Sequence, residues 1–279
     1  CCLGLSFALT APKASAQTYT TIDVPGATET DANSINTAKT IAGFSLDASG
    51  IATGFTRTAS GTIQKLRVPG ASDTRAYGIN DKNQVVGWYI SSTDGLTHGF
   101  LFNQGKYNKI DPPGSQTTNV WTISNDGTVI VGTYVGSDGI FHGFTRKGGT
   151  YTTYDAPSAT LTEFTGVNKA GIMVGIWEDA NLTENGFTLQ GTKFTSVTYP
   201  GSNITATDRI NDSNEIVGLW GTSGQSEPFM GYKRMAGKFT AINFPGSTGT
   251  RCRGLDNAGD IVGRYTDAAG VVHGMLVTP

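Results

Sequence analysis

Residues 75–114 read RAYGINDKNQVVGWYISSTDGLTHGFLFNQGKYNKIDPPG, and this stretch is one of six copies of a repeat that covers nearly all of the chain after residue 17. The clearest marker of the repeat is a Pro-Gly turn, which is Pro-Ser in one copy. Its prolines lie 43 to 45 residues apart, at Pro25, Pro69, Pro113, Pro157, Pro200 and Pro245. A fixed period of this size is typical of solenoids, propellers and related repeat arrays.

Further markers hold the same period. A glycine follows a short aliphatic run in every unit, at Gly43, Gly87, Gly132, Gly175, Gly218 and Gly263. Each unit also contains four short β-type runs bounded by turn residues, which in the second unit are residues 74–79, 84–90, 98–103 and 106–112. No window has a sustained apolar period of 3.6 residues, so we expect almost no helix.

Four strands in a unit of about 44 residues match a propeller blade better than the shorter coil of a β-solenoid. Propellers commonly have four to eight blades. The sequence therefore predicts an all-β fold, a six-bladed β-propeller of four-stranded antiparallel blades, as a single domain over residues 18–279. The repeat units are residues 27–70, 71–114, 115–158, 159–201, 202–246, and 247–279 together with 18–26.

The two ends of the repeat region predict how the ring closes. Residues 18–26 are a separate copy of a fourth strand, and the last unit ends after its third strand. We therefore expect residues 18–26 to complete the last blade by pairing with residues 272–278. Such a pairing removes an open sheet edge that would otherwise favour aggregation.

Residues 1–17 (CCLGLSFALTAPKASAQ) lack the repeat pattern. They hold a short apolar run and then Ala14-Ser15-Ala16, which fits the cleavage site of a secretory signal peptide. A membrane anchor is the alternative, but the apolar run is shorter than the roughly 18 residues that span a bilayer, and no other stretch is long enough. We expect a residual signal peptide and a protein exported to the extracellular space or the periplasm.

The composition excludes some partners. The chain of 279 residues has 38 glycines, 15% charged residues and a formal net charge of −2, which gives no basic face for nucleic acid. We expect a monomer that neither binds nucleic acid nor inserts into a membrane. Cys252 is the single cysteine outside the leader and falls in a mostly apolar slot of the repeat, so we expect a buried structural thiol.

The three histidines, His98, His142 and His273, occupy one repeat position on the third strand. Equivalent positions on different blades are far apart around the ring, so these imidazoles are expected to bond strands together and not to share a metal ion. Recurrent aspartates in the hairpin between the second and third strands are expected to cap turns, at Asp47, Asp94, Asp138, Asp179 and Asp267. No nucleophile, phosphate-loop, dinucleotide or metal motif occurs, so we predict no catalytic residue, metal or cofactor.

Two positions at the start of the first strand vary between units while their neighbours stay alike. The first holds Asp31, Arg75, Asn119, Glu163, Ala206 and Arg251, and the second holds Asn33, Tyr77, Trp121, Thr165, Asp208 and Arg253. The first strand of a blade lines the central channel, so these side chains are expected to ring one mouth of it. The candidate binding residues are Asp31, Arg75, Tyr77, Trp121, Glu163, Asp208, Arg251 and Arg253.

The pattern I-N-D…I-V-G…D-G…H-G-F resembles the extracellular HAF-repeat family of bacteria, and His98-Gly99-Phe100 and His142-Gly143-Phe144 match it best. Thr53, Asn185 and Met230 depart from the histidine of that step. The resemblance implies an exported, propeller-type repeat protein and transfers no activity to any residue.

Aromatic, arginine and carboxylate side chains together suit a polar ligand through stacking and bidentate hydrogen bonds. We therefore expect a secreted module that binds a glycan or a surface partner at one mouth of the channel. One alternative is a propeller enzyme, similar to glycosidases, lyases or lactonases, with Glu163, Asp31 and Asp208 as candidate acids. Another is a structural component of an extracellular matrix without a small-molecule site.

Overall fold

The computed structural model describes residues 17–181, 183–222 and 228–279; apart from Gln17, the expected leader lies outside the described residues. The described chain is all β, with no helix, as the sequence predicted. Its strands are β1 (Thr18–Ile22), β2 (Glu29–Ile35), β3 (Ile41–Leu46), β4 (Ala52–Arg57), β5 (Ile63–Leu66), β6 (Ala71–Ile79), β7 (Val85–Ser91), β8 (Thr97–Asn103), β9 (Lys106–Ile110), β10 (Thr117–Ile123), β11 (Val129–Val135), β12 (Phe141–Lys147), β13 (Thr150–Tyr154), β14 (Leu161–Val167), β15 (Met173–Glu178), β16 (Glu184–Gln190), β17 (Lys193–Val197), β18 (Ile204–Ile210), β19 (Ile216–Gly221), β20 (Met230–Met235), β21 (Lys238–Ile242), β22 (Gly249–Leu255), β23 (Ile261–Thr266) and β24 (Val272–Thr278).

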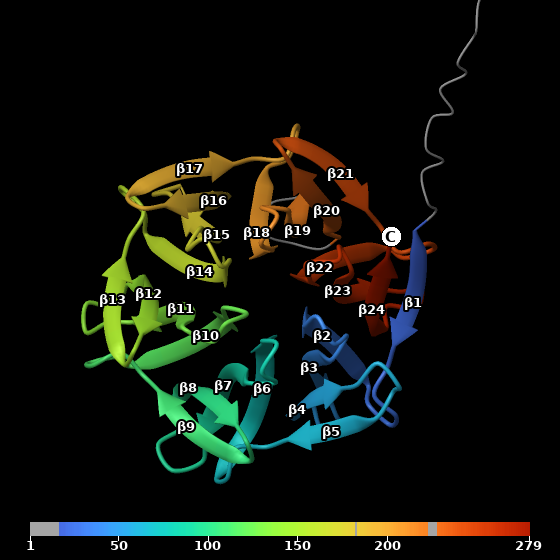
Figure 1. The fold of residues 1–279 in the computed structure, drawn as a ribbon, viewed down its shortest axis with the longest axis horizontal. Coiled ribbons are helices and arrows are strands. Elements are labelled where there is room, and N and C mark those ends of the chain that lie inside the picture. The colour runs from blue at the N-terminus through green and yellow to red at the C-terminus, as the bar shows by residue number, and fades with distance from the viewer. Residues whose placement is uncertain (1–16, 182, 223–227) are drawn as a thin grey trace, which may run out of the picture.

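The strands pair as antiparallel neighbours in chain order. Three sheets have the orders β2-β3-β4-β5, β6-β7-β8-β9 and β18-β19-β20-β21. Strands β10–β13 and β14–β17 form two further sets, which are joined into one eight-stranded sheet by a single parallel pair, Phe141 with Leu161. The sheets stand around a common axis as in a β-propeller, with β2, β6, β10, β14, β18 and β22 nearest the centre (Figure 1).

The pairing expected between the two ends of the chain is confirmed. Strand β1 lies antiparallel to β24, with Thr18 opposite Thr278 and Ile22 opposite Gly274. The sheet therefore has the order β1-β24-β23-β22, and residues from both ends of the described chain share it. The outer edge of β24 is covered in this way, as the sequence predicted.

The glycine marker is explained by a close approach between the first and second strands of each unit. A methyl group on Gly175 would overlap the backbone carbonyl oxygen of Glu163, and the other five repeat glycines meet the equivalent carbonyl in the same way. In five units the third strand also carries an aromatic residue after a glycine, and its ring is buried: Phe100 and Phe144 have no exposed surface. The glycine lets the strands approach, and the aromatic side chain fills the space between neighbouring sheets.

Two further repeat positions are also structural. One holds a threonine in every unit (Thr30, Thr74, Thr118, Thr162, Thr205 and Thr250), and the other holds an asparagine in four units (Asn36, Asn80, Asn168 and Asn211). The Thr74 hydroxyl accepts a hydrogen bond from the Val68 amide at 3.2 Å, which fixes the loop that leads into β6. Asn36 donates from Nδ2 to the Asn80 carbonyl oxygen at 3.1 Å and so joins one sheet to the next. These bonds recur around the ring because each unit must turn and dock in the same way.

The hydrophobic core lies between adjacent sheets and not inside one of them. One cluster combines Ala42 of β3 with Ile79, Val85 and Phe100 of the following sheet. Cys252 is fully buried in such a cluster, and burial raises the pKa of its thiol far above the usual range. The expectation of a buried structural thiol is confirmed.

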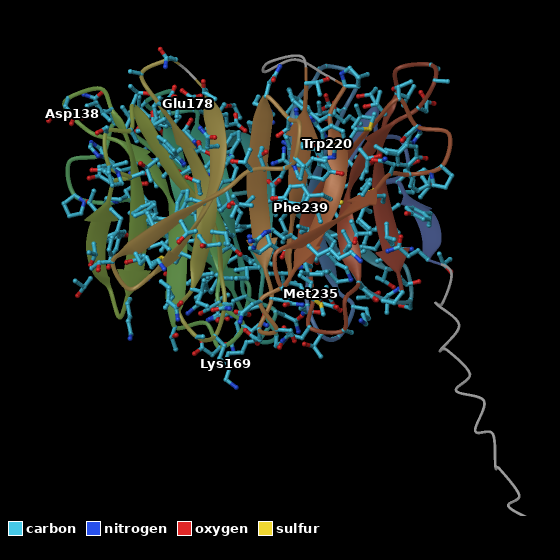
Figure 2. All side chains as sticks on the ribbon, turned by 90° about the horizontal axis from the view of Figure 1, so that it is seen from above. Asp138, Lys169, Glu178, Trp220, Met235 and Phe239 are labelled. Atoms are coloured by element: carbon cyan, nitrogen blue, oxygen red, sulfur yellow. The ribbon has the colours of Figure 1, made fainter. Side chains whose placement is uncertain are left out.

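The molecule has two faces at the ends of its axis. Glu178 and Asp138 lie at one of them and Lys169 at the other (Figure 2). The face with Glu178 and Asp138 is called the mouth face here, because the variable residues lie toward it. No helix long and apolar enough to cross a membrane occurs among residues 17–181, 183–222 and 228–279.

Candidate functional site

Each innermost strand contains a β-bulge, and the residue in the bulge belongs to the second variable position. On β6, for example, the pairing with β7 skips from Ala76 to Gly78 and leaves Tyr77 unpaired. The bulge residues of the other innermost strands are Asn33, Trp121, Thr165, Asp208 and Arg253. A bulge re-aims a side chain, and here it turns one variable residue from every unit toward the axis.

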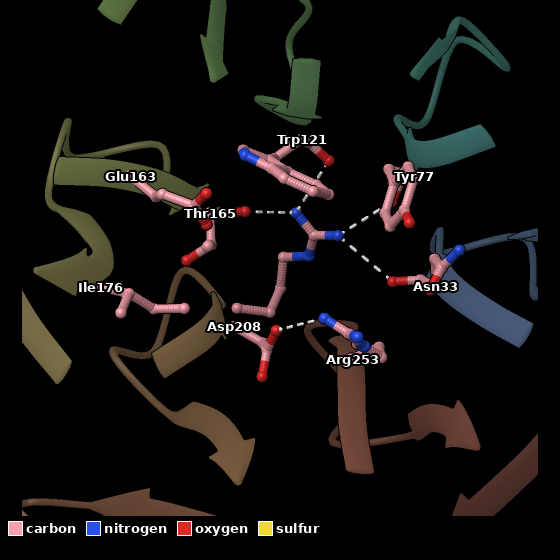
Figure 3. Close-up of a pocket in the computed structure, with 9 residues that line it drawn as sticks. Asn33, Tyr77, Trp121, Glu163, Thr165, Ile176, Asp208 and Arg253 are labelled. Carbon is pink, nitrogen blue, oxygen red and sulfur yellow. Dashed lines mark hydrogen bonds and ion pairs between the residues drawn. The ribbon is translucent and has the colours of Figure 1, made fainter. Parts of the chain in front are cut away.

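These six bulge residues line one cavity in the centre of the molecule (Figure 3). Glu163, Ile176 and Arg209 complete its wall, and its volume is about 40 Å³. A water molecule needs about 10–15 Å³ of such volume, so the cavity has room for a few waters or for one polar group of a larger ligand. A ligand the size of a sugar would have to lie over the mouth and insert only one group.

Arg209 closes the channel below this cavity. Its Nη1 donates to the Thr165 carbonyl oxygen at 2.7 Å and to that of Trp121 at 3.4 Å. Its Nη2 donates to the carbonyl oxygens of Tyr77 at 2.9 Å and Asn33 at 3.2 Å. The dashed lines of Figure 3 mark these bonds. One guanidinium therefore holds four bulges, and its burial lowers its pKa to about 10.

The carboxylate of Asp208 supports the arginines of the site. Its Oδ1 accepts a hydrogen bond from Arg253 Nη1 at 3.0 Å. Burial alone would lower the pKa of Arg253, but the negative charges of Asp208 and Asp31 raise it above its ordinary value. The charge of Arg253 is therefore fixed in the cavity wall.

Aromatic rings form the opposite part of the wall. The rings of Tyr77 and Trp121 meet edge to face with centroids 4.7 Å apart, and Tyr77 stacks on Trp88 at 6.0 Å. The Trp121 indole donates to the Thr133 hydroxyl at 3.2 Å, which fixes its orientation. Burial raises the pKa of Tyr77 to about 12, so its hydroxyl stays neutral and can donate.

Glu163 has no hydrogen bond or ion pair among the described residues, although it lines the cavity. Burial, with repulsion from Glu184, raises the pKa of Glu163 to about 7. The side chain can thus change between hydrogen-bond donor and acceptor near neutral pH.

Buried polar atoms without a partner gather around the same cavity. Among the described residues they include Asn33 Oδ1, Asp208 Oδ2, Arg209 Nε and Arg253 Nε. Buried polar groups almost always have a hydrogen-bond partner, so unpaired acceptors and donors at one cavity point to water or a ligand group there.

The structure brings together five of the eight predicted residues, namely Tyr77, Trp121, Glu163, Asp208 and Arg253. Three predicted residues do not line the cavity. Asp31 is buried and accepts from Arg264 at 3.1 Å. Arg75 lies over the rings of Phe44 and Trp88 and pairs with Asp73 at 3.1 Å, while Arg251 lies over Phe229. Of the candidate acids, Asp31 and Asp208 are therefore held by arginines.

Arg209 and Ile176 were missed by the sequence prediction, whereas Asn33 and Thr165 were placed at the second variable position but not among the candidate binding residues. A signal for Arg209 exists, because the other five units have a small residue at its position: Ser34, Gly78, Thr122, Gly166 and Gly254. A single long cation among small residues at the channel axis indicates that one side chain fills the space that the others leave.

The histidines bond strands together, as predicted. His142 Nδ1 lies 3.0 Å from Asp155 Oδ1, and its Nε2 lies 3.1 Å from Asp138 Oδ2. His98 and His273 are held between two aspartates in the same way. Burial lowers the pKa of His142, but the hydrogen bonds to Asp155 and Asp138 outweigh it, so the pKa lies above its ordinary value.

The aspartates of the hairpins cap their turns, as predicted. Asp47 Oδ1 accepts from the amides of Ser49 at 2.9 Å and Ile51 at 3.1 Å. Asp94, Asp138, Asp179 and Asp267 each accept from backbone amides two or four residues ahead. Within residues 17–181, 183–222 and 228–279, no three side chains of His, Cys, Asp or Glu lie close enough to hold a metal ion together.

Comparison with known proteins supports the fold. No family model matches the chain, and no curated protein matches its sequence. Solved structures do match: a mutant of Aleuria aurantia lectin in complex with Fucα1-6GlcNAc has a TM-score of 0.55 at 11% identity, over 92% of this chain and 93% of the lectin. A putative TolB from Agrobacterium tumefaciens gives 0.62 at 10% identity, over 90% of each chain. The β-propeller domain of the Trilobed protease from Pyrococcus furiosus gives 0.54 at 7% identity, over 90% of this chain and 94% of that one. At these identities the likeness shows a β-propeller fold and nothing further.

Proposed function

We propose that this protein is a secreted six-bladed β-propeller that binds an extracellular polar ligand, a glycan, at the mouth of its central channel. Counting β10–β13 and β14–β17 as separate blades gives the six repeat units one blade each, with β1 completing the last. The HAF-repeat pattern and the expected signal peptide support export to the extracellular space or the periplasm.

The observation that carries the proposal is the ring of bulge residues around one cavity. Six equivalent backbone positions present six different side chains to the axis, while the residues that build the blades repeat. Packing alone would favour repetition there too. The unpaired Asn33 Oδ1, Arg253 Nε and Asp208 Oδ2 offer hydrogen bonds to an inserted hydroxyl group.

The chemistry of the rim favours a sugar. Trp121 and Tyr77 provide rigid aromatic surface with polar tips, which suits the alternating apolar and hydroxyl faces of a pyranose ring. Glu163 can accept from a sugar hydroxyl when ionised and donate to a ring oxygen when protonated. The small volume of the cavity fits one hydroxyl, so the ring itself would lie across the rim.

A glycan panel tests this proposal. The whole protein is compared with a Trp121→Phe/Glu163→Gln variant, which keeps an aromatic ring and a side chain of the same shape as glutamate. Asp47→Asn is the control away from the channel. We expect binding by the parent and the control and a loss of about tenfold or more in the double variant. Equal binding by all three proteins, or none by the parent, would overturn a glycan site at the mouth.

A further inference from the structure

A second cavity lies between two neighbouring blades on the mouth face. Its wall comes from the start of β16 (Glu184, Asn185), the residue after β17 (Thr198) and the loop before β18 (Ser202, Asn203). Its volume is about 400 Å³, which falls within the range of about 300–1,000 Å³ that ligand pockets occupy. Unlike the channel cavity, it has room for a whole sugar ring.

Three side-chain donors of this cavity each make a hydrogen bond within the protein. Asn185 Nδ2 donates to the Thr183 carbonyl oxygen at 3.1 Å, and Asn203 Nδ2 donates to that of Thr222 at 2.7 Å. The Ser202 hydroxyl donates to the Tyr199 carbonyl oxygen at 2.7 Å. These bonds use the amide nitrogens of Asn185 and Asn203 and leave the amide oxygens as acceptors. No arginine, lysine or histidine is among the residues that line the cavity. The wall therefore offers a ligand the amide oxygens and the Glu184 carboxylate, with no positive side chain beside them.

The acceptors include a carboxylate that has a second glutamate beside it. Glu184 stands directly opposite Glu178 in the ladder of β15 and β16. Like charges in directly opposite positions destabilise a sheet. The same place in other blades holds uncharged pairs: Leu46 with Ala52, Ile90 with Thr97, Val135 with Phe141 and Thr266 with Val272. The paired glutamates are therefore a feature of this blade and not of the repeat.

Charges of both signs surround Glu184, and the net effect disfavours its ionised form. The side chain has no hydrogen bond or ion pair among the described residues. Burial, with the charges of Asp208 and Glu178, raises its pKa to about 7 against the opposing charges of Arg251 and Arg253. Asp208 itself keeps one buried oxygen, Oδ2, without a partner. A positive group in the cavity would restore the ionised form of Glu184, so the site favours a cationic ligand over a neutral one.

We propose that the cleft between β16, β17 and β18 binds an amino sugar, a hexosamine with a free amine, and that its ammonium group contacts Glu184. The proposal rests on the glycan-binding function proposed above and names the chemical class of the sugar. An ammonium group brings three donors and one positive charge to a wall that holds a carboxylate and amide oxygens, whereas an acetylated amine brings one donor and no charge. The sugar hydroxyls then donate to the oxygens of Asn185 and Asn203.

Titration calorimetry of the whole protein at pH 7 tests this inference, with D-glucosamine and N-acetyl-D-glucosamine as the probes. We expect glucosamine to bind at least tenfold more tightly than its acetylated form, and Glu184→Gln to lose about tenfold in glucosamine affinity. Asp47→Asn is the matched control, because it removes one negative charge from a hairpin on the same face of another blade and keeps an oxygen that can cap the turn. This control is expected to bind glucosamine as the parent does.

The other outcomes contradict the proposal in distinguishable ways. Equal affinity for the two sugars, or an unchanged affinity in Glu184→Gln, would overturn it even if the glycan panel shows a ligand at the channel mouth. Tighter binding of N-α-acetyl-lysine methylamide than of glucosamine would overturn the sugar class in favour of a protein side chain. A panel without any binding to the parent, together with no binding of glucosamine, would overturn this inference and the proposed function together.

Discussion

Arg209 Nη2 donates a hydrogen bond to the backbone carbonyl oxygen of Tyr77 at 2.9 Å, although β18 and β6 stand across the channel from each other and the residues are 132 positions apart (Figure 1). The same guanidinium reaches three further bulges, on β2, β10 and β14. One side chain therefore ties together the innermost strands that shape the candidate site.

Replacing Arg209 by methionine should destabilise the protein. The change removes the side chain that donates to four backbone carbonyl oxygens and leaves these buried oxygens without that partner. We expect the free energy of unfolding to fall by about 3 kcal/mol, measured by denaturant unfolding. Arg146→Met serves as the control, because Arg146 lies over Tyr151 at the periphery, and should change stability by about 0.5 kcal/mol or less. A variant as stable as the parent would show that the channel does not depend on this cation.

Replacing Gly175 by alanine should be costly for a steric reason. The added methyl group would overlap the carbonyl oxygen of Glu163, so β14 and β15 would have to separate at the wall of the site. We expect a loss of about 3 kcal/mol in the free energy of unfolding, or failure to fold. Gly54→Ala is the comparison, since its nearest neighbour would lie at 3.2 Å, and it should cost about 1 kcal/mol. Equal costs in the two variants would contradict the close-approach explanation.

Ionisation of Glu163 should lower the free energy of unfolding as the pH rises. Its pKa rises from 4.5 in the unfolded chain to about 7 in the folded one, so the stability that it contributes is complete below pH 4.5 and is lost as the pH rises through 7. Glu163→Gln cannot ionise. We expect parent and variant to be equally stable at pH 4.5, and the variant to be more stable by about 1–2 kcal/mol at pH 8. Denaturant unfolding at both pH values measures this, and a less stable variant at pH 8 would refute it.

The histidine bridges should produce a related pH dependence at the outer strands. Since the pKa of His142 is raised by Asp155 and Asp138, its contribution to stability is complete below the unfolded value of 6.5 and is lost as the pH rises through the folded pKa. Titration of the imidazole signals by NMR should give a pKa above 6.5 for His142 and also for His273. His142→Gln should remove its share of this pH dependence. A pKa at or below 6.5 would mean that the carboxylates do not stabilise the protonated imidazole.

Much of the fold could be predicted because the same structural requirements recur in neighbouring repeat units and keep the same residue types there. The glycine at position 175 and its five equivalents must allow a close strand approach, and the bonds made by Thr74 and Asn36 recur at equivalent residues of other units. Because neighbouring blades share these demands, the residues repeat. The pairing of β1 with β24 followed from the same counting.

The site was predicted less well because the sequence does not show where a β-bulge occurs or how far a long side chain reaches. Tyr77 and Trp121 were expected at the mouth, but the bulge that turns them toward the axis is not revealed by period counting. Arg75 was a candidate binding residue, but it does not line the cavity, and its guanidinium lies over Phe44 and Trp88. Conversely, Arg209 reaches the axis from a position that is small in every other unit, and only its length puts it there.

The most direct test of the account is a crystal structure of the whole protein soaked with the strongest ligand from the glycan panel. We predict a sugar ring over Trp121 and Tyr77, with one hydroxyl oxygen inserted into the channel cavity within hydrogen-bond distance of Asn33 Oδ1 and Arg253 Nε. A sugar bound away from both the channel mouth and the cleft at Glu184, with the channel cavity holding only water, would contradict the central claim.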